Sequence, residues 1–399
     1  MPYSTKIFIS NLHTLNGDPM KLTWLFLISI LLISLFCSAI VYNHYNSTNE
    51  VAEEDFFFGV SFGGNTTSQA KQLIDKVKGY TNFFLINSWE ITINETALNE
   101  ICDYALDANL NFMVFFDFIS HSGYPWDLTW LDTAKERWGD SFLGIYLYDE
   151  PGGRQLGLGQ WDEGIIPKNI SDYGEAAEFF VTSISSTWGM QDLKERGISV
   201  FTSDFVLYWF DYLAGYDAIF VEFGWNNSRP QQVALGRGAA NVQNKEWGTI
   251  ITWTYQHPPY IENATQLLED LKTAYRGGPK YLVVFDFPYN QTNPYGILTE
   301  EHFDAMETFW NMTDSLETVE AEAAFILPKD YGWGMRSLTD NIWFPQWGPD
   351  SKSPLIWENM NKLIRRYDLK LDIIYDEPRF GFEEKYFQIY LWNDQITLN

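Results

Sequence analysis

The sequence predicts an α/β fold: a (β/α)8 barrel, or TIM barrel, with a smaller C-terminal α/β domain and an N-terminal transmembrane helix. Short apolar segments alternate with amphipathic ones eight times between residues 55 and 315. Most of these apolar segments are continuous, which is typical of parallel strands that are covered on both faces. One long uncharged segment precedes them. Repeated strand–helix units of this kind favour a closed barrel.

The expected strands are rich in Phe, Ile, Val and Tyr, and they cover 56–62, 82–87, 112–118, 142–148, 198–204, 218–223, 249–255 and 281–287. The expected helices cover 68–80, 97–108, 126–138, 176–196, 210–216, 229–241, 265–275 and 300–310. In the second helix, the periodicity places Leu98, Ile101, Cys102 and Leu106 on the inward face. A doubly wound open sheet is the alternative, but no Gly-X-Gly-X-X-Gly turn follows the first strand.

Residues 316–399 have a different pattern, with expected strands at 323–327, 371–375 and 386–391 and a helix at 354–367. The predicted organisation is therefore a cytoplasmic N-terminus (1–21), an anchor or signal (22–42), a stalk (43–54), the barrel (55–315) and the C-terminal domain (316–399).

The apolar segment that begins at Leu22 and ends at Tyr42 contains neither a charged residue nor a proline. About 20 such residues in a helix can cross the hydrocarbon core of a membrane. Lys6 and Lys21 precede the segment and no Lys or Arg follows until Lys71, which favours a cytoplasmic N-terminus. We expect a single-pass membrane protein with its C-terminal part outside the cell. The alternative is a cleaved signal peptide and a secreted protein.

The chain carries a net charge of −27, so it would repel nucleic-acid phosphates, and we expect no nucleic-acid partner. Cys102 is the only cysteine outside the apolar segment, which excludes an intrachain disulfide in the remainder. Eight Asn-X-Ser/Thr sequons suggest a glycoprotein of the cell exterior. They begin at Asn46, Asn65, Asn94, Asn169, Asn226, Asn263, Asn290 and Asn311.

Acidic and aromatic residues follow several of the expected strands, at the end where barrel enzymes carry their active sites. The carboxylates are Asp117, Asp149, Glu150, Glu222 and Asp286, and the aromatic residues are Trp89, Trp225, Trp253 and Tyr255. Paired carboxylates hydrolyse glycosidic bonds, and aromatic rings can stack on sugars. The adjacent carboxylates Asp149 and Glu150 should raise the pKa of one of the two, which suits a proton donor. The alternative roles are structural: Asp204 and Asp286 would anchor loops or cap helices, and Glu150 would cap a helix or pair with Arg154.

The segment Tyr148-Asp149-Glu150-Pro151 resembles the Asn-Glu-Pro motif of a large clan of barrel glycoside hydrolases, whose acid/base glutamate ends strand four. Glu150 and Pro151 match this motif, whereas Asp149 replaces the asparagine. The C-terminal domain resembles the one that follows the barrel in β-galactosidase-like members, and its segment 327–334 resembles a sugar-site loop. The resemblance implies carbohydrate hydrolysis without a cofactor.

The clan's nucleophile is a glutamate at the end of strand seven, where this chain has Trp253-Thr254-Tyr255. Glu222 is our first choice for the second carboxylate, because strands four and six can contribute to one layer of a barrel. Asp149 and Asp286 are the other candidates.

Other chemistries have less support. The chain lacks a Gly-X-Ser-X-Gly motif and the His-X-His or His-Glu-X-X-His spacings of metal sites, so we expect no metal. Arg154, Arg237 and Lys329 could bind an acidic sugar. The sequence thus predicts an extracytoplasmic glycoside hydrolase-like protein that acts on a polysaccharide or glycan. The alternative is a non-catalytic glycan-binding or cell-envelope protein on the same scaffold.

Overall fold

The computed structural model describes residues 56–117, 129–156, 165–167, 169–287, 293–332, 336–343, 347 and 349–397. The predicted cytoplasmic N-terminus, anchor and stalk lie outside these residues. Within the described part of the chain, no helix is both long enough and apolar enough to span a membrane.

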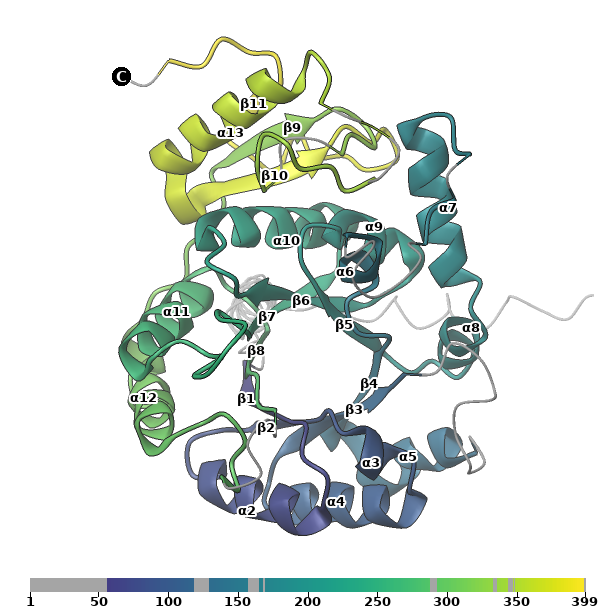
Figure 1. The fold of residues 1–399 in the computed structure, drawn as a ribbon, viewed down its shortest axis with the longest axis vertical. Helices are drawn as coiled ribbons and strands as arrows, with labels where there is room; N and C mark the ends of the chain where they lie inside the picture. Colours follow the sequence, from purple (N-terminus) through teal and green to yellow (C-terminus); the bar gives the residue numbers. More distant parts are fainter. Residues whose placement is uncertain are drawn as a thin grey trace, which may run out of the picture. The chain divides into compact units, whose positions relative to one another are not determined.

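Eight parallel strands form a closed barrel, in which each strand pairs with its neighbours in the sequence and β1 also pairs with β8 (Figure 1). The strands are β1 (Phe57–Phe62), β2 (Phe83–Ile86), β3 (Asn111–Phe116), β4 (Phe142–Leu147), β5 (Val200–Asp204), β6 (Ala218–Phe223), β7 (Glu246–Ile251) and β8 (Tyr281–Val284). The predicted barrel is confirmed. The seventh strand begins and ends earlier than expected, so Trp253 and Tyr255 lie in the loop that follows it.

Helices surround the strands (Figure 1). They are α2 (Thr67–Val77), α3 (Trp89–Thr92), α4 (Glu95–Asp107), α5 (Trp130–Trp138), α6 (Pro151–Leu156), α7 (Tyr173–Ser185), α8 (Trp188–Glu195), α9 (Tyr208–Ala214), α10 (Arg229–Gln243), α11 (Ala264–Arg276) and α12 (Glu300–Trp310).

Two sequence-based expectations about these helices were wrong. The single helix expected over 176–196 is two helices, because the Thr187 side chain caps a new helix by accepting the Met190 N–H at 3.4 Å. In α4, Leu106 is 37% exposed, whereas Ala105 is buried. Position 105 lies four residues after Ile101 and therefore takes the inward place on the helix.

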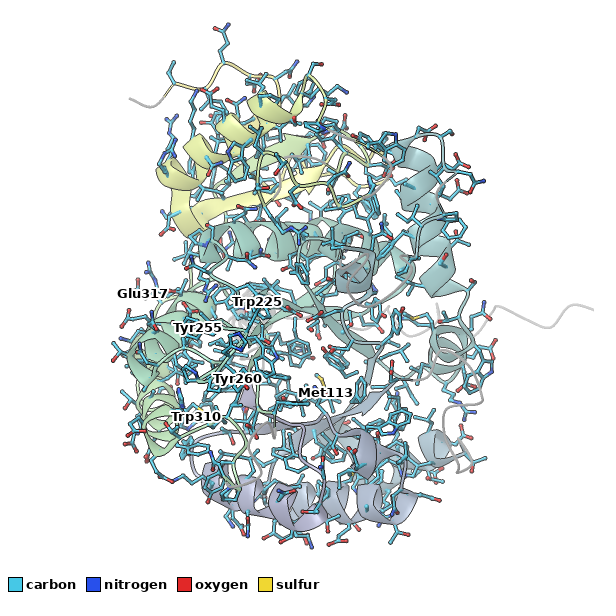
Figure 2. The ribbon with its side chains drawn as sticks, viewed as in Figure 1. Met113, Trp225, Tyr255, Tyr260, Trp310 and Glu317 are labelled. Atoms are coloured by element: carbon cyan, nitrogen blue, oxygen red, sulfur yellow. The ribbon has the colours of Figure 1, made fainter. Side chains whose placement is uncertain are left out.

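A cluster of buried side chains from all eight strands fills the inside of the barrel. Its members are Phe57, Phe83, Leu85, Met113, Tyr146, Phe201, Ala218, Phe220, Ile250, Tyr281 and Val283. Figure 2 shows Met113 inside the ring of strands. Because side chains alternate along a strand, Glu222 points into the barrel in the same direction as Phe220. The interior is thus packed below and polar at its carboxyl-terminal end.

A separate three-stranded parallel sheet follows the barrel, in the order β10-β9-β11. Its elements are β9 (Ala323–Leu327), α13 (Ser353–Tyr367), β10 (Leu371–Tyr375) and β11 (Gln388–Leu391). The predicted α/β character of the C-terminal residues is confirmed, although the last strand is shorter than expected. Barrel and small sheet belong to one compact unit, Phe56–Asn399, and α10 lies between them in Figure 1.

Arg237 joins this small sheet to the barrel. Its Nε donates to the Asp372 carboxylate at 2.8 Å, and its other nitrogens donate to four backbone carbonyls, those of Gly277, Val319, Leu369 and Leu371. The side chain is buried, so the suggestion that Arg237 could bind an acidic sugar was wrong. A guanidinium whose five donors are all used inside the protein is a structural link.

Candidate active site

The loop after β4 carries the two adjacent carboxylates, and its backbone is strained. Tyr148 has φ of 58° and Glu150 has φ of 49°, in the left-handed region that costs a non-glycine residue about 1–2 kcal/mol. Among the described residues, ten non-glycine positions have positive φ, and six lie in the loops after β4 to β7. Such residues concentrate at functional sites, where the surrounding structure holds them in place. The positive-φ residues therefore gather at the carboxyl-terminal end of the barrel, where barrel enzymes carry their active sites.

Asp204, at the end of β5, anchors this loop. Its buried carboxyl group accepts the Gly152 N–H at 2.5 Å and the Phe205 N–H at 2.6 Å. Gly152 is the second residue of α6, so Asp204 satisfies the amino-terminal end of that helix. Burial, and then the nearby Asp211 carboxyl group, raise the pKa of Asp204 well above its usual range. Asp204 thus has the structural role considered for it.

Glu150 directly precedes α6, and its side chain lies against Gly153 in the first turn of that helix. A residue in that position normally has extended backbone, whereas Glu150 is left-handed. Its N–H donates to the Ser203 carbonyl at 3.2 Å, which fixes the backbone between β4 and β5. The side chain is half-buried.

A hydrogen-bonded network connects Glu222 on β6 to Asp149 through β5 and β4. Ser203 Oγ lies 2.8 Å from Glu222 Oε1 and 2.7 Å from Tyr146 Oη, and the Tyr146 hydroxyl donates to Asp149 Oδ1. The Ser203 N–H also donates to Tyr146 Oη at 3.1 Å. The structure therefore brings Asp149 and Glu222 into one network at the barrel mouth.

Glu222 is only 2% exposed. Burial raises its pKa well above the usual range, and the negative charges of Glu150 and Asp149 act in the same direction. At neutral pH, this environment favours the protonated form. Asp149 is less buried than Glu222, and it accepts the Tyr146 hydroxyl.

The two remaining predicted carboxylates lie after β3 and β8. Asp117 is half-buried at the end of β3. Asp286 is 3% exposed and accepts the Ile297 N–H at 3.0 Å, and burial raises its pKa to about 7. A buried carboxyl group that accepts loop N–H groups has the geometry of a loop anchor, which was the alternative considered for Asp286.

Exposed aromatic rings follow β2, β6 and β7. Trp89, Trp225 and Tyr255 are 41%, 43% and 43% exposed, in agreement with a surface that could contact a ligand. Trp253 packs edge-on against Tyr260, with ring centroids 4.8 Å apart. Figure 2 shows Trp225, Tyr255 and Tyr260 close together on the β7 side of the barrel.

The sequence analysis missed three residues of this site: Tyr146, Ser203 and Phe287. Phe287 is 41% exposed after β8, and its ring lies 6.1 Å from that of Trp253. It follows Phe285 at the spacing of one strand face, and this signal could have identified it. Tyr146 and Ser203 lie inside strands, whereas only strand ends were considered.

Charged residues also surround a pocket of about 440 Å³ between α7, α9 and the loops after β9 and β10. Lys329 lines it and pairs with Glu377 at 3.1 Å. Among the described residues, including those of this pocket, no group of three or more His, Cys, Asp or Glu residues is placed to hold a metal ion.

Comparisons with known proteins support the barrel fold. No family model and no curated protein matches the sequence. The β-galactosidase of Rahnella sp. R3 superimposes with a TM-score of 0.55 at 9% identity, covering 85% of this chain and 67% of that one. GH5_18 from Streptomyces cattleya, solved in complex with GlcNAc, superimposes with a TM-score of 0.52 at 12% identity, covering 85% of this chain and 99% of that one. The β-galactosidase of Marinomonas ef1 superimposes with a TM-score of 0.50 at 11% identity, covering 81% of this chain and 70% of that one.

The chain therefore has a glycoside hydrolase-like (β/α)8 fold, as the sequence predicted. At these identities the likeness concerns the fold alone, and it does not test the Asp-Glu-Pro motif. Activity must be argued from the residues at the mouth.

Proposed function

We propose that this protein is a glycoside hydrolase that acts outside the cytoplasm on a polysaccharide or glycan. The observation that carries the proposal is the convergence of Asp149, Glu150 and Glu222 at one barrel mouth, beside exposed aromatic rings. Glycoside hydrolysis needs a proton donor and a second carboxyl group on either side of the scissile bond. Aromatic faces supply the stacking surface for the sugar.

In this proposal Glu150 is the general acid, which donates its proton to the glycosidic oxygen as the bond breaks. Asp149 is the partner carboxylate and either attacks the sugar or activates water. The hydrogen bond from Tyr146 fixes the position of Asp149. Trp89, Trp225 and Tyr255 form the sugar platforms, and no step requires a cofactor.

A non-catalytic glycan-binding protein is the second candidate. It is favoured by the absence of a carboxylate in the segment Trp253-Thr254-Tyr255, directly after β7. In that case the aromatic rings would bind sugar without hydrolysis.

The test is to assay the full-length protein against a panel of chromogenic glycosides and polysaccharides, with parallel binding measurements. Hydrolysis that is lost in Glu150→Gln supports the enzyme. Sugar binding without hydrolysis on any member of the panel supports the second candidate.

We further propose that the segment from Leu22 to Tyr42 anchors the protein, with the barrel outside the cell. The uncharged sequence and the preceding lysines support this orientation. All six sequon asparagines in the described residues are exposed, as glycosylation requires: Asn65, Asn94, Asn169, Asn226, Asn263 and Asn311.

A further inference from the structure

We propose that Glu222, Ser203, Tyr146 and Asp149 form a proton relay, which stores one proton in the barrel and can pass it to the mouth. The catalytic use of this proton rests on the proposed function, whereas its presence and mobility do not. Two of the four groups, Ser203 and Tyr146, are neutral hydroxyls, and neither gives up or takes up a proton in the proposed acid/base mechanism.

Counting hydrogens shows that the network holds an extra proton. Ser203 Oγ lies 3.4 Å from Asp149 Oδ1, which is longer than an ordinary O–H···O hydrogen bond. Three short oxygen–oxygen contacts connect the chain through Tyr146 instead: Glu222 Oε1 to Ser203 Oγ at 2.8 Å, Ser203 Oγ to Tyr146 Oη at 2.7 Å, and Tyr146 Oη to Asp149 Oδ1. Each contact needs one hydrogen between its two oxygens. The hydroxyls of Ser203 and Tyr146 supply two, so a carboxyl group must supply the third.

The surroundings place this proton on Glu222. Its Oε2 is buried and has no hydrogen-bond partner among the described residues. A buried unpartnered oxygen costs far less in a neutral carboxyl group than in a carboxylate. Asp149, in contrast, is half-buried and receives the Tyr146 hydroxyl.

The titratable groups around Glu222 act in the same direction. The carboxyl groups of Glu150, Asp149 and Asp204 all disfavour ionisation of Glu222 through their negative charge. Tyr208 on α9 also lies near, but its hydroxyl donates to Gln232 Oε1 at 2.5 Å.

With the proton on Glu222, every hydrogen bond points the same way. Glu222 donates to Ser203, Ser203 donates to Tyr146, and Tyr146 donates to Asp149. In one shift, the Glu222 Oε1–H bond breaks as a Ser203 O–H bond forms. The former Ser203 hydrogen moves to Tyr146 Oη, and the former Tyr146 hydrogen moves to Asp149 Oδ1. The result is an ionised Glu222 and a protonated Asp149, with no change in the total number of protons.

Infrared difference spectroscopy tests the stored proton without any substrate. Full-length protein is studied at pH 7 in a detergent that has no carbonyl group. A protonated Glu222 gives a carboxylic-acid C=O band that is absent from Glu222→Gln, and Ser203→Ala shifts this band because its hydrogen bond is lost. Subtracting the variant spectrum removes the contributions of other protonated carboxyl groups, such as Asp286. If Glu222→Gln does not fold, ¹³C labelling of glutamate identifies the band, which Ser203→Ala must still shift. Glu262, whose pKa burial raises to about 8, can give a glutamic-acid band of its own. The absence of any glutamic-acid band at pH 7 that responds to Glu222→Gln or Ser203→Ala would therefore overturn the proposal.

Exchange of the same proton with D₂O tests its mobility. In the relay, exchange proceeds through Asp149, so Tyr146→Phe should slow the deuteration shift of the band by about tenfold or more. Tyr281→Phe is the matched control, because Tyr281 belongs to the same interior cluster but binds Glu246 at 2.8 Å instead. Exchange in Tyr146→Phe that is as fast as in Tyr281→Phe would refute the relay, whatever the protein hydrolyses.

Discussion

The proposed role of Glu150 as general acid can be tested by two substitutions, which separate the loss of its acidic proton from the relief of its backbone strain. Glu150→Gln keeps the size of the side chain and removes the acidic proton. Glu150→Gly removes the side chain and also relieves the left-handed backbone, which has φ of 49°. If Glu150 is the general acid, both variants should lose activity, but only the glycine variant should become more stable.

The expected loss of turnover and the expected gain in stability have different physical causes. Loss of a general acid lowers turnover by about 10²- to 10⁴-fold, which corresponds to a barrier increase of about 3–5 kcal/mol. Glycine relieves about 1–2 kcal/mol of left-handed strain and loses about 0.5–1 kcal/mol because its unfolded chain is more flexible. We therefore expect Glu150→Gly to raise the free energy of unfolding by about 0.5–1 kcal/mol.

The assay combines turnover on an identified glycoside with urea denaturation. Glu90→Gln is the charge control, because Glu90 is exposed beside Trp89 at the same rim. Asp368→Gly is a second strain variant, because Asp368 also has φ of 49°, with ψ of −126°, and belongs to the C-terminal segment, after α13. A folded Glu150→Gln variant with full turnover would remove Glu150 from the mechanism. A glycine variant less stable than wild type would show that the side chain of Glu150 is a structural support.

Further predictions concern binding, stability, pH and topology. Trp225→Ala should weaken sugar binding in calorimetry without loss of stability, whereas Phe387→Ala, on the edge of the small sheet and 96% exposed, should change neither. Arg237→Met should destabilise the protein by about 3–5 kcal/mol in urea, because the buried Asp372 loses its partner. Burial raises the pKa of Asp286 from 3.8 to about 7, so the native state binds a proton that the unfolded state releases. The free energy of unfolding should therefore fall by about 4 kcal/mol as the pH rises from about 4 to about 7, and Asp286→Asn should flatten this slope. Protease treatment of intact cells should release the barrel and spare the N-terminus; protection of the barrel would contradict the proposed topology.

The fold could be predicted because it depends on a repeated pattern. Eight apolar segments separated by amphipathic helices leave few alternatives to a closed parallel barrel. The helix expected over 176–196 shows where this reasoning stops. Thr187 begins a second helix with a single side-chain hydrogen bond, and periodicity alone does not register such a cap.

The site could be predicted only in part, for a geometric reason. Residues at strand ends reach the mouth in any barrel, so Asp149, Glu150 and Glu222 could be identified without coordinates. Tyr146 and Ser203 reach it from inside their strands, and they matter because β4 and β5 bring two hydroxyl groups within 2.7 Å. That proximity depends on the register between neighbouring strands, which a single sequence does not specify.

The missing glutamate after β7 has a structural counterpart in the way this loop is built. The N–H groups of Thr254 and Tyr255 both donate to the Tyr260 carbonyl, at 2.8 and 2.9 Å, and the Trp253 carbonyl accepts the Trp225 N–H at 2.7 Å. The loop after β7 is thereby folded into a support for aromatic rings. The next carboxyl group along the chain, Glu262, pairs with Arg229 at 3.4 Å. Burial, and then the nearby Asp270, raise the pKa of Glu262 to about 8.

The proposed catalytic carboxyl groups and the exposed rings come from partly different strands. Asp149, Glu150 and Glu222 come from β4 and β6, and most of the exposed rings come from the loops after β6, β7 and β8. In the proposed mechanism Glu150 and Asp149 at the end of β4 are the reacting pair, so the proton held by Glu222 would have to stay on Glu222 while Asp149 acts as a carboxylate.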